Sequence, residues 1–192
     1  MSPPGAGTIE QLETQIGEAL RLASSLGATQ AEAAASFGTG FSVNVRLGEV
    51  ETVEHHRDQG LGISVYFGKR KGSASTSDLR PAALEETVRK ACSLARFAAE
   101  DGCTGLADPD RLARDIPDLG LCHHWPLEPE AAIRLAAECE AAAMGVDPRI
   151  DNSEGATVST GEGGRAYGNT HGFLAGRSEE HTSELQSQFR IS

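Results

Sequence analysis

The first regular pattern along the chain is helical. Over residues 9–26, apolar side chains recur every three to four positions, which predicts an amphipathic α-helix. Thr8 and Gln11 have the identities and spacing of a capping box at the start of this helix. Gly27 directly follows the last periodic residue, and glycine commonly ends a helix. The sequence therefore predicts both the helix and its two ends.

Over residues 28–77, apolar and polar side chains alternate at every second position, which is typical of strands with one buried face. Gly48 interrupts the alternation once, and the basic, glycine-led turn at residues 68–71 interrupts it again. Residues 59–62 suggest a further bend or bulge. The pattern predicts an antiparallel meander, and its alternating apolar positions are Phe41, Val43, Val45, Leu47, Leu61, Ile63, Val65 and Phe67.

The second half of the chain returns to helices and then to glycine-rich strands. Pro81 and Pro129 each fit the first position of a helix, and an irregular, proline-containing stretch separates the two helices at residues 100–127. Strand-like residues follow from 148 to 176, with a hairpin tip expected at residues 161–164. We expect an α+β fold in which an antiparallel β-sheet meander packs against three main helices.

Composition and charge narrow the class of protein. The chain has 192 residues and a formal net charge of -11, and it has no stripe of Lys and Arg, which argues against nucleic-acid binding. It contains no apolar run of about 18 residues, so we expect no membrane helix. Its first residues do not resemble a secretory signal. We expect a cytoplasmic protein with free thiols at its cysteines, Cys92, Cys103, Cys122 and Cys139.

Two clusters have the residue types of a metal site. His55 and His56 lie next to each other near Asp58, but neighbouring strand residues point to opposite faces. The second cluster, at residues 122–124, is Cys-His-His in a proline-flanked loop, with Cys103 or Cys139 as a conceivable fourth ligand. Consecutive residues seldom form a tetrahedral site. We therefore favour incidental surface residues over metal ligands in both places.

Three further patterns have a simple structural interpretation. The glycine-rich residues 161–164 include Glu162, which would repel a phosphate. The alternating serines at residues 73–77 have no activating base placed beside them by the sequence. The basic residues 69–71 form a turn that is either solvated or in contact with an acidic peptide or a partner subunit.

The last residues, 177–192, differ from the strands before them. They read RSEEHTSELQSQFRIS, which resembles the in-frame translation of a sequencing-library adapter. We therefore expect a domain over residues 1–176 and a foreign or disordered tail over residues 177–192. A natural polar C-terminus is the alternative. On the adapter interpretation, the natural protein continues beyond Gly176 and this chain is the front part of it.

Three stretches occur in an order and spacing that resemble a known family. They are GEVE at residues 48–51 with GLGISVY at 60–66, KGSASTSDL at 71–79, and NSEG at 152–155 with GNTHGF at 168–173. Together they resemble the N-terminal domain of the TldD/PmbA metallopeptidase family, and the PmbA (TldE-type) subunits more than the TldD type. The resemblance covers nearly all of residues 9–176.

The resemblance implies a function for the complete protein and a partner subunit. Family members are considerably longer, cytosolic proteins that act as heterodimers of TldD-type and PmbA-type subunits. Together these form a zinc metalloprotease that hydrolyses unfolded peptides and leader peptides. The zinc ligands belong to an HExxxH helix and a later cysteine of the TldD-type subunit. Zinc polarises the peptide carbonyl and activates water in such enzymes.

This chain has neither HExxxH nor HExxH, so we expect it to be inactive alone and to bind no metal itself. The resemblance implies substrate-chamber and subunit contacts, for which His171, Asn169, Tyr66 and Arg70 are the candidate residues. His171 also fits a structural turn. Two alternatives remain open from the residues: a free-standing, non-enzymatic peptide- or protein-binding module, and a TldD-type protein whose catalytic motif lies downstream.

Overall fold

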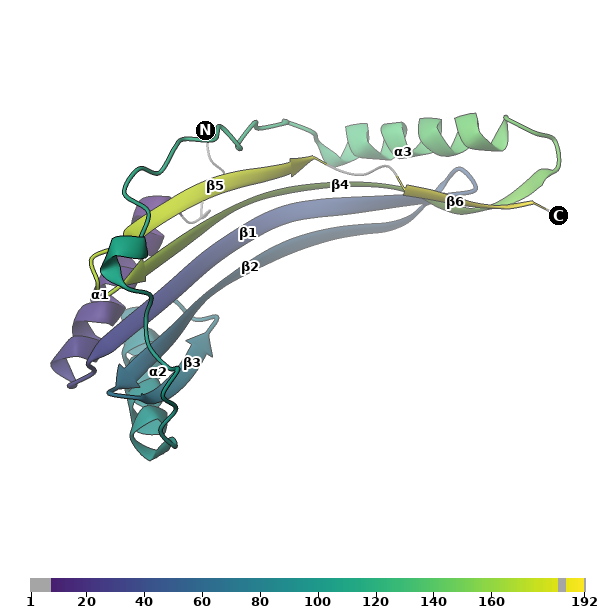
Figure 1. Cartoon of the computed structure of the whole chain (residues 1–192). Coiled ribbons are helices and arrows are strands. Elements are labelled where there is room, and N and C mark those ends of the chain that lie inside the picture. Colours follow the sequence, from purple (N-terminus) through teal and green to yellow (C-terminus); the bar gives the residue numbers. More distant parts are fainter. Residues whose placement is uncertain (1–7, 183–185, 192) are drawn as a thin grey trace. The chain divides into compact units, whose positions relative to one another are not determined.

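A computed structural model of the chain describes residues 8–182 and 186–191, with side chains as far as residue 179. Within these residues the chain forms three α-helices and a sheet of six strands (Figure 1). In chain order the elements are α1 (Ile9–Ser25), β1 (Gln30–Arg46), β2 (Glu49–Phe67), β3 (Arg70–Thr76), α2 (Pro81–Phe97), a short 3-10 helix (Pro109–Arg111), α3 (Pro129–Met144), β4 (Ile150–Asn169), β5 (Leu174–Thr182) and β6 (Gln186–Ile191).

The strands form one antiparallel sheet in the order β3-β2-β1-β4-β5, and β6 pairs with β4. The first three strands are a meander, with Leu61 of β2 opposite Thr76 of β3 and Phe67 opposite Arg70. The predicted α+β class and the meander are therefore confirmed. No bend divides β2, which continues through the predicted bulge at residues 59–62.

The predicted hairpin tip at residues 161–164 is wrong, because β4 runs unbroken through it. The glycines there serve packing instead of a turn. A Cβ atom on Gly164 would lie 2.6 Å from the ring of Phe37 and 2.8 Å from the side chain of Ile9. A glycine inside a strand often marks such a close approach of a neighbour. Sequence alone does not distinguish this use of glycine from a turn.

The helix ends follow local sequence chemistry. The hydroxyl of Thr8 accepts from the Gln11 amide at 3.2 Å, and the Gln11 side chain accepts from the Thr8 amide at 3.0 Å. This confirms the predicted capping box, and Gly27 follows with a φ of 91°. Helices α2 and α3 both begin with the predicted prolines. Among the described residues, no helix combines the length and hydrophobicity needed to cross a membrane.

The chain divides into two compact units. Unit 1 comprises Met1–Phe37, Asp58–Gly120 and Gly163–Ser178. In it, α1 and α2 cover one face of the sheet (Figure 1). The small residues of β1 allow the helices to approach closely, because alanine fills little space between the two layers. The core of unit 1 consists mainly of Leu12, Ile16, Ala31, Ala33, Leu61, Ile63, Val65 and Val88.

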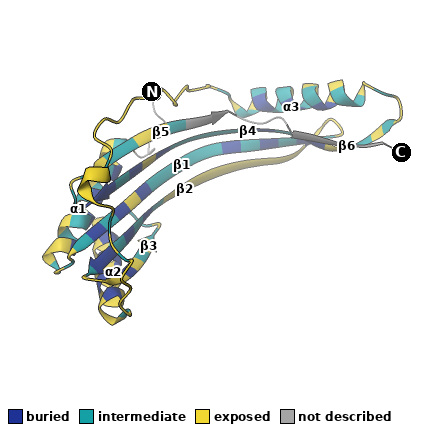
Figure 2. Ribbon diagram, viewed as in Figure 1, coloured by how far each residue is buried: buried dark blue, intermediate teal, exposed yellow. Residues whose placement is uncertain are grey.

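Unit 2 comprises Gly38–Arg57, Leu121–Glu162 and Glu179–Ser192. Its core lies between α3 and β1 and β4, and consists mainly of Phe41, Val43, Val45, Ala132, Ala136, Ala156 and Val158. Residues 49–57 of β2 are exposed throughout, as the continuous yellow stretch in Figure 2 shows. This unit therefore buries only part of its sheet.

The predicted tail is partly described. Its first residues extend β5 as far as Thr182, and β6 pairs with β4 from Ile150 to Thr157. Residues 183–185 and residue 192 lie outside the described residues. Any extended segment can pair with an open strand edge. A foreign or disordered tail at residues 177–192, and a domain over residues 1–176, therefore stay predictions.

Candidate functional site

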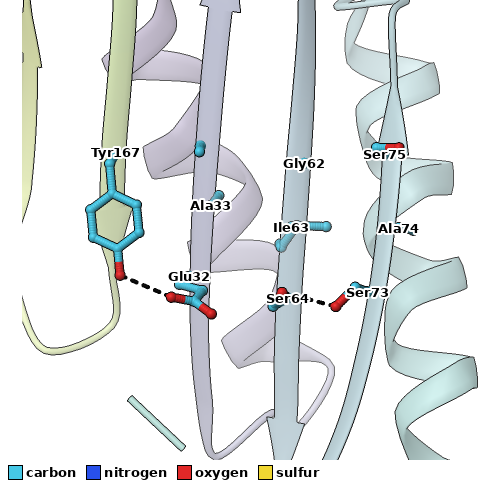
Figure 3. A pocket seen from close by; sticks show the side chains of 10 residues that line it. Glu32, Ala33, Gly62, Ile63, Ser64, Ser73, Ala74, Ser75 and Tyr167 are labelled. Atoms are coloured by element: carbon cyan, nitrogen blue, oxygen red, sulfur yellow. Dashed lines mark hydrogen bonds between the residues drawn. The ribbon is translucent and has the colours of Figure 1, made fainter. Parts of the chain in front are cut away.

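The face of the unit 1 sheet that points away from α1 and α2 is polar. Ala31, Ala33 and Ala35 of β1 pack against the helices, so the residues between them point the other way. Figure 3 shows this second face, with the helices behind the strands. We call it the polar face, and its main residues are Glu32, Ala34, Gly62, Ser64, Tyr66, Lys71, Ser73, Ser75, Tyr167 and Asn169.

A pocket of about 420 Å³ opens on the polar face, between strands β3, β2, β1 and β4 (Figure 3). Small residues leave room for it, since Gly62 and Ala34 lie where longer side chains would fill the space. A Cβ atom added to Gly62 would have no other atom within 4 Å. Hydroxyls border the pocket at Ser64 and Ser73, whose Oγ atoms are 2.9 Å apart. Its volume lies in the range of small-ligand sites.

Glu32 is the only carboxylate among the residues that line this pocket. Its Oε1 accepts from the Tyr66 hydroxyl at 2.6 Å, and its Oε2 accepts from the Tyr167 hydroxyl at 3.0 Å. Lys71 Nζ lies 3.8 Å from Oε1, which makes an ion pair but is too long for a hydrogen bond. The two phenols thus hold the carboxylate in one orientation, while 27% of the side chain stays exposed.

The two tyrosines remain hydrogen-bond donors over the ordinary pH range. Burial raises the pKa of Tyr66, and the hydrogen bond to Glu32 and the charge of Glu32 raise it further. The pKa of Tyr167 is also raised, first by burial, with Glu32 adding to the shift and Asn169 opposing it. A phenol that stays protonated keeps donating to the carboxylate. The two phenols therefore add no charge of their own to this cluster.

Two residues predicted from the sequence lie in this cluster. Tyr66 donates to Glu32, and its ring lies 5.4 Å from Lys71 Nζ. The Asn169 amide donates to the Tyr167 hydroxyl at 3.5 Å, and its Oδ1 accepts from the backbone amide of His171 at 3.0 Å. Asn169 therefore connects the tyrosine cluster to the turn that follows β4. A substrate or subunit contact by either residue stays a prediction.

His171 uses both ring nitrogens within unit 1. Its Nδ1 lies 3.0 Å from the Ala107 carbonyl oxygen, which can only accept, so Nδ1 carries the proton. Its Nε2 then accepts from the Gln30 side-chain amide at 3.2 Å. The imidazole therefore joins the β4–β5 turn to the segment around Ala107. The structural role that the sequence left open has a clear basis, and substrate contact stays a prediction.

Arg70 lies apart from the other three candidates. Its guanidinium pairs with Glu100 at 3.3 Å and donates to the backbone carbonyl of Arg96, at the end of α2, at 3.5 Å. Neighbouring Lys71, which sequence analysis treated only as part of a basic turn, points to the polar face. Alternation along β3 explains this difference, because successive strand residues point to opposite faces.

Sequence analysis missed Glu32 and Tyr167. Glu32 is surrounded by alanines, and that composition gives no sign that the carboxylate has polar partners. One sequence feature could have located Glu32. If Ala31, Ala33 and Ala35 face the core in an extended strand, the carboxylate of Glu32 must point to the opposite face. Tyr167 lies in a glycine-rich stretch, and nothing local indicates that it meets Glu32, 135 residues away in the sequence.

The histidine and cysteine clusters do not fit a zinc site. His124 pairs with Glu162, and the ring of His55 packs against Phe41 with centroids 5.8 Å apart. Over residues 8–179, the structure brings together no group of three His, Cys, Asp or Glu side chains suited to a metal ion. A protein zinc site needs at least three such ligands. The described donors therefore do not fit the zinc that the resemblance implies for the assembly.

Two family models match the chain. Residues 31–95 match PmbA/TldA metallopeptidase domain 1, and residues 122–183 match the PmbA/TldA metallopeptidase central domain. Glu32, Tyr66 and Lys71 lie in the first match, whereas Tyr167 lies in the second.

Curated relatives carry the same family name. The chain is 47% identical over 165 residues to the metalloprotease PmbA of Escherichia coli O157:H7 and covers 36% of that protein. It is 44% identical over 183 residues to the metalloprotease PmbA homolog of Haemophilus influenzae and covers 39% of it. These matches take in 86% and 95% of this chain. The chain thus spans less than half the length of either relative.

Solved structures share the fold. A putative modulator of DNA gyrase from Bacteroides thetaiotaomicron superposes with a TM-score of 0.79 at 26% identity, over 88% of this chain and 38% of that one. TldE from Thermococcus kodakarensis superposes with a TM-score of 0.70 at 17% identity, over 86% of this chain and 37% of that one. At 17% identity the second likeness concerns the fold alone.

Proposed function

Because the chain belongs to the PmbA/TldD metallopeptidase family, we propose that it is part of a PmbA-type subunit of a cytosolic, zinc-dependent peptidase. In this assembly it supplies contacts to the peptide substrate and to a TldD-type subunit. The substrates are unfolded peptides and leader peptides. This chain does not carry out the cleavage itself.

The observation that carries the proposal is the polar face of unit 1 in a chain of this family. Four strands present hydroxyls, an oriented carboxylate and a pocket on a face that α1 and α2 leave uncovered. The hydroxyls and the carboxylate of such a surface can hydrogen-bond to the backbone of an extended polypeptide, whatever its side chains are. A binding role therefore fits the described residues better than a role in bond cleavage.

The absence of HExxxH from the sequence and the donor set of residues 8–179 support placing zinc in another part of the assembly. We assign no step of the hydrolysis to the residues of this chain. Their proposed task is to hold an extended peptide and to pair with the partner subunit.

The test is reconstitution. The chain and a TldD-type subunit are purified separately and together, and hydrolysis of an unfolded fluorogenic peptide is followed with and without a chelator. We expect the pair to copurify and to show chelator-sensitive hydrolysis that the chain alone lacks. Chelator-sensitive hydrolysis by the purified chain alone would overturn the proposal, as would a failure of the two proteins to associate.

A further inference from the structure

The carboxylate of Glu32 has unused capacity to accept hydrogen bonds. An ionised carboxylate has about four acceptor positions. Tyr66 and Tyr167 take two of them, one on each oxygen. Lys71 Nζ stays 3.8 Å away, and its side chain is 45% exposed, so it neutralises part of the charge without occupying an acceptor position. A further donor can therefore reach Glu32 from the pocket.

The pocket beside Glu32 can hold an alkyl chain that ends in such a donor. Its floor is formed by Gly62 and Ala34, and the backbone there is open to the pocket. Ser64 and Ser73 offer hydroxyl oxygens at its border. A primary ammonium has three donors, which match one carboxylate oxygen and nearby hydroxyls. The lining thus combines an apolar floor with a convergent set of acceptors.

The charge of the whole chain favours a cation over an anion. The formal net charge is -11, and Glu32 is the carboxylate that lines the pocket. A negatively charged protein attracts cationic ligands at long range, and the fixed carboxylate then provides a short-range contact. An anionic group entering the same pocket would be repelled by the Glu32 carboxylate.

We propose that the pocket on the polar face binds a primary ammonium group of an extended peptide, with Glu32 as its counter-charge. This inference rests on the proposed function, because it names a chemical preference for the peptide-contact role given there. The ligand ammonium takes an acceptor position of Glu32 that Tyr66, Tyr167 and Lys71 leave open. The ammonium can come from a lysine side chain or from the N-terminus of the peptide.

Three short peptides of alanine and serine separate these sources. The first is acetylated and has one central lysine, so its only ammonium is on a side chain. The second has norleucine at that position and a free N-terminus. The third has norleucine and is acetylated, so it keeps the alkyl chain and carries no ammonium. Binding to the full chain is measured by calorimetry.

We expect the acetylated norleucine peptide to bind at least about tenfold more weakly than one or both ammonium peptides, since charge-assisted hydrogen bonds are strong. Whichever ammonium peptide binds tightly identifies the source. Equal affinity of all three peptides, or tightest binding of the peptide without an ammonium, would overturn the proposal.

Two variants test the location. Glu32→Gln removes the charge, and it should weaken the preferred ammonium peptide about tenfold without changing the acetylated norleucine peptide. Gly62→Val leaves Glu32 in place and fills the pocket, since a Cβ there meets no atom within 4 Å. Gly62→Val should also weaken binding of the preferred ammonium peptide about tenfold. Glu86→Gln, on the exposed side of α2, is the matched charge control and should bind like the unsubstituted chain.

These experiments still test the proposed ammonium site if one of the two variants fails to fold. The peptide comparison requires no variant, and Gly62→Val suits a strand because valine favours extended backbone. Unchanged ammonium binding in folded Glu32→Gln or in Gly62→Val would exclude this pocket. If reconstituted hydrolysis succeeds while the ammonium preference is absent, only this inference fails. If association with the TldD-type subunit fails, the proposed function fails independently.

Discussion

At the residue scale, the β1–β2 connection carries local strain. Leu47 has a φ of 51° and Gly48 a φ of 79°, the left-handed pair that a two-residue hairpin turn requires. Glycine adopts this region freely, whereas leucine does so at a cost of about 1 to 2 kcal/mol. Leu47 is 56% exposed and has little packing to compensate for that cost.

Replacing Leu47 with asparagine should therefore stabilise the protein. Asparagine tolerates the left-handed region, so we expect Leu47→Asn to raise the free energy of unfolding by about 1 kcal/mol in urea titrations. Val53→Asn is the control, because Val53 is 44% exposed but lies inside β2. There the same change should lower stability, since asparagine is disfavoured in strands. A loss of stability in Leu47→Asn would contradict the assignment of strain.

Glu140 stabilises the same turn from α3. It is 3% exposed, and its carboxylate accepts from the backbone amides of Leu47 at 2.8 Å and Gly48 at 2.9 Å. Glu140→Gln would place an amide group opposite one of these donors. We expect a loss of about 2 to 4 kcal/mol in the free energy of unfolding. Glu138→Gln, one exposed residue of the same helix, should change stability by less than about 0.5 kcal/mol.

The contribution of Glu140 should also depend on pH. Burial opposes its charged form, but hydrogen bonds from Ser153, Gly48 and Leu47, with the charge of Arg46, outweigh burial, and the pKa is lowered. A glutamate in the unfolded chain titrates at about pH 4.3. The stabilisation is therefore complete above that pH and is lost as the pH falls through the lower folded pKa.

Urea titrations from pH 7 to pH 3 test this linkage. The stability difference between the unsubstituted chain and Glu140→Gln should be largest at neutral pH and shrink below about pH 4.3. A difference that stays constant over this range, or that grows on acidification, would contradict the lowered pKa.

The sequence could not predict these two carboxylates. Glu32 and Glu140 acquire their partners only through tertiary contact, with Tyr167 and Leu47 far away in the chain. A glutamate in a helix or among alanines is usually solvated. Tyr66 and Asn169 could be identified only through the resemblance to a family, not through a local rule.

At the element scale, α2 packs closely on β3 at one glycine. A Cβ atom on Gly72 would lie 2.3 Å from the carbonyl oxygen of Ala91 and 2.4 Å from the amide nitrogen of Ala95. Both are backbone atoms, so the helix must shift if a side chain is added. We expect Gly72→Ala to cost about 1 to 3 kcal/mol in unfolding free energy, measured by thermal or urea denaturation.

Gly62→Ala is the matched control on the opposite face, where an added Cβ meets no atom within 4 Å. It should be neutral or slightly stabilising, because alanine reduces the entropy of the unfolded chain. Equal destabilisation by the two substitutions would show that strand glycines, not helix packing, determine the effect.

The elements themselves were predictable where local chemistry specifies them. Local interactions within one helical turn specify the helix starts, through the capping box at Thr8 and the prolines that begin α2 and α3. In the second half of β2, the alternation of apolar and polar residues indicates which face is buried. The hairpin expected at residues 161–164 failed for a physical reason. Glycine there makes room for Phe37 and Ile9, and those partners cannot be identified from neighbouring residues.

At the scale of the whole molecule, net charge sets the conditions for binding. With a formal net charge of -11, attraction of a cationic peptide should weaken as salt shortens the screening length, to about 3 Å at 1 M. We expect the preferred ammonium peptide to bind several-fold more weakly at 1 M than at 0.1 M salt in calorimetry. The acetylated norleucine peptide should change little, and an equal loss for both would contradict an electrostatic contribution.

The exposed first half of β2 also has a consequence for the free chain. Strand β3 pairs with β2 only from Leu61 onward, so in the described part of the chain residues 49–57 present an open backbone edge. Glu49 and Glu54 lie on this stretch, and their charges oppose pairing with an identical edge on another molecule. Salt screens this repulsion, so dilute storage at low ionic strength should best prevent fibril-like stacking of the purified polypeptide.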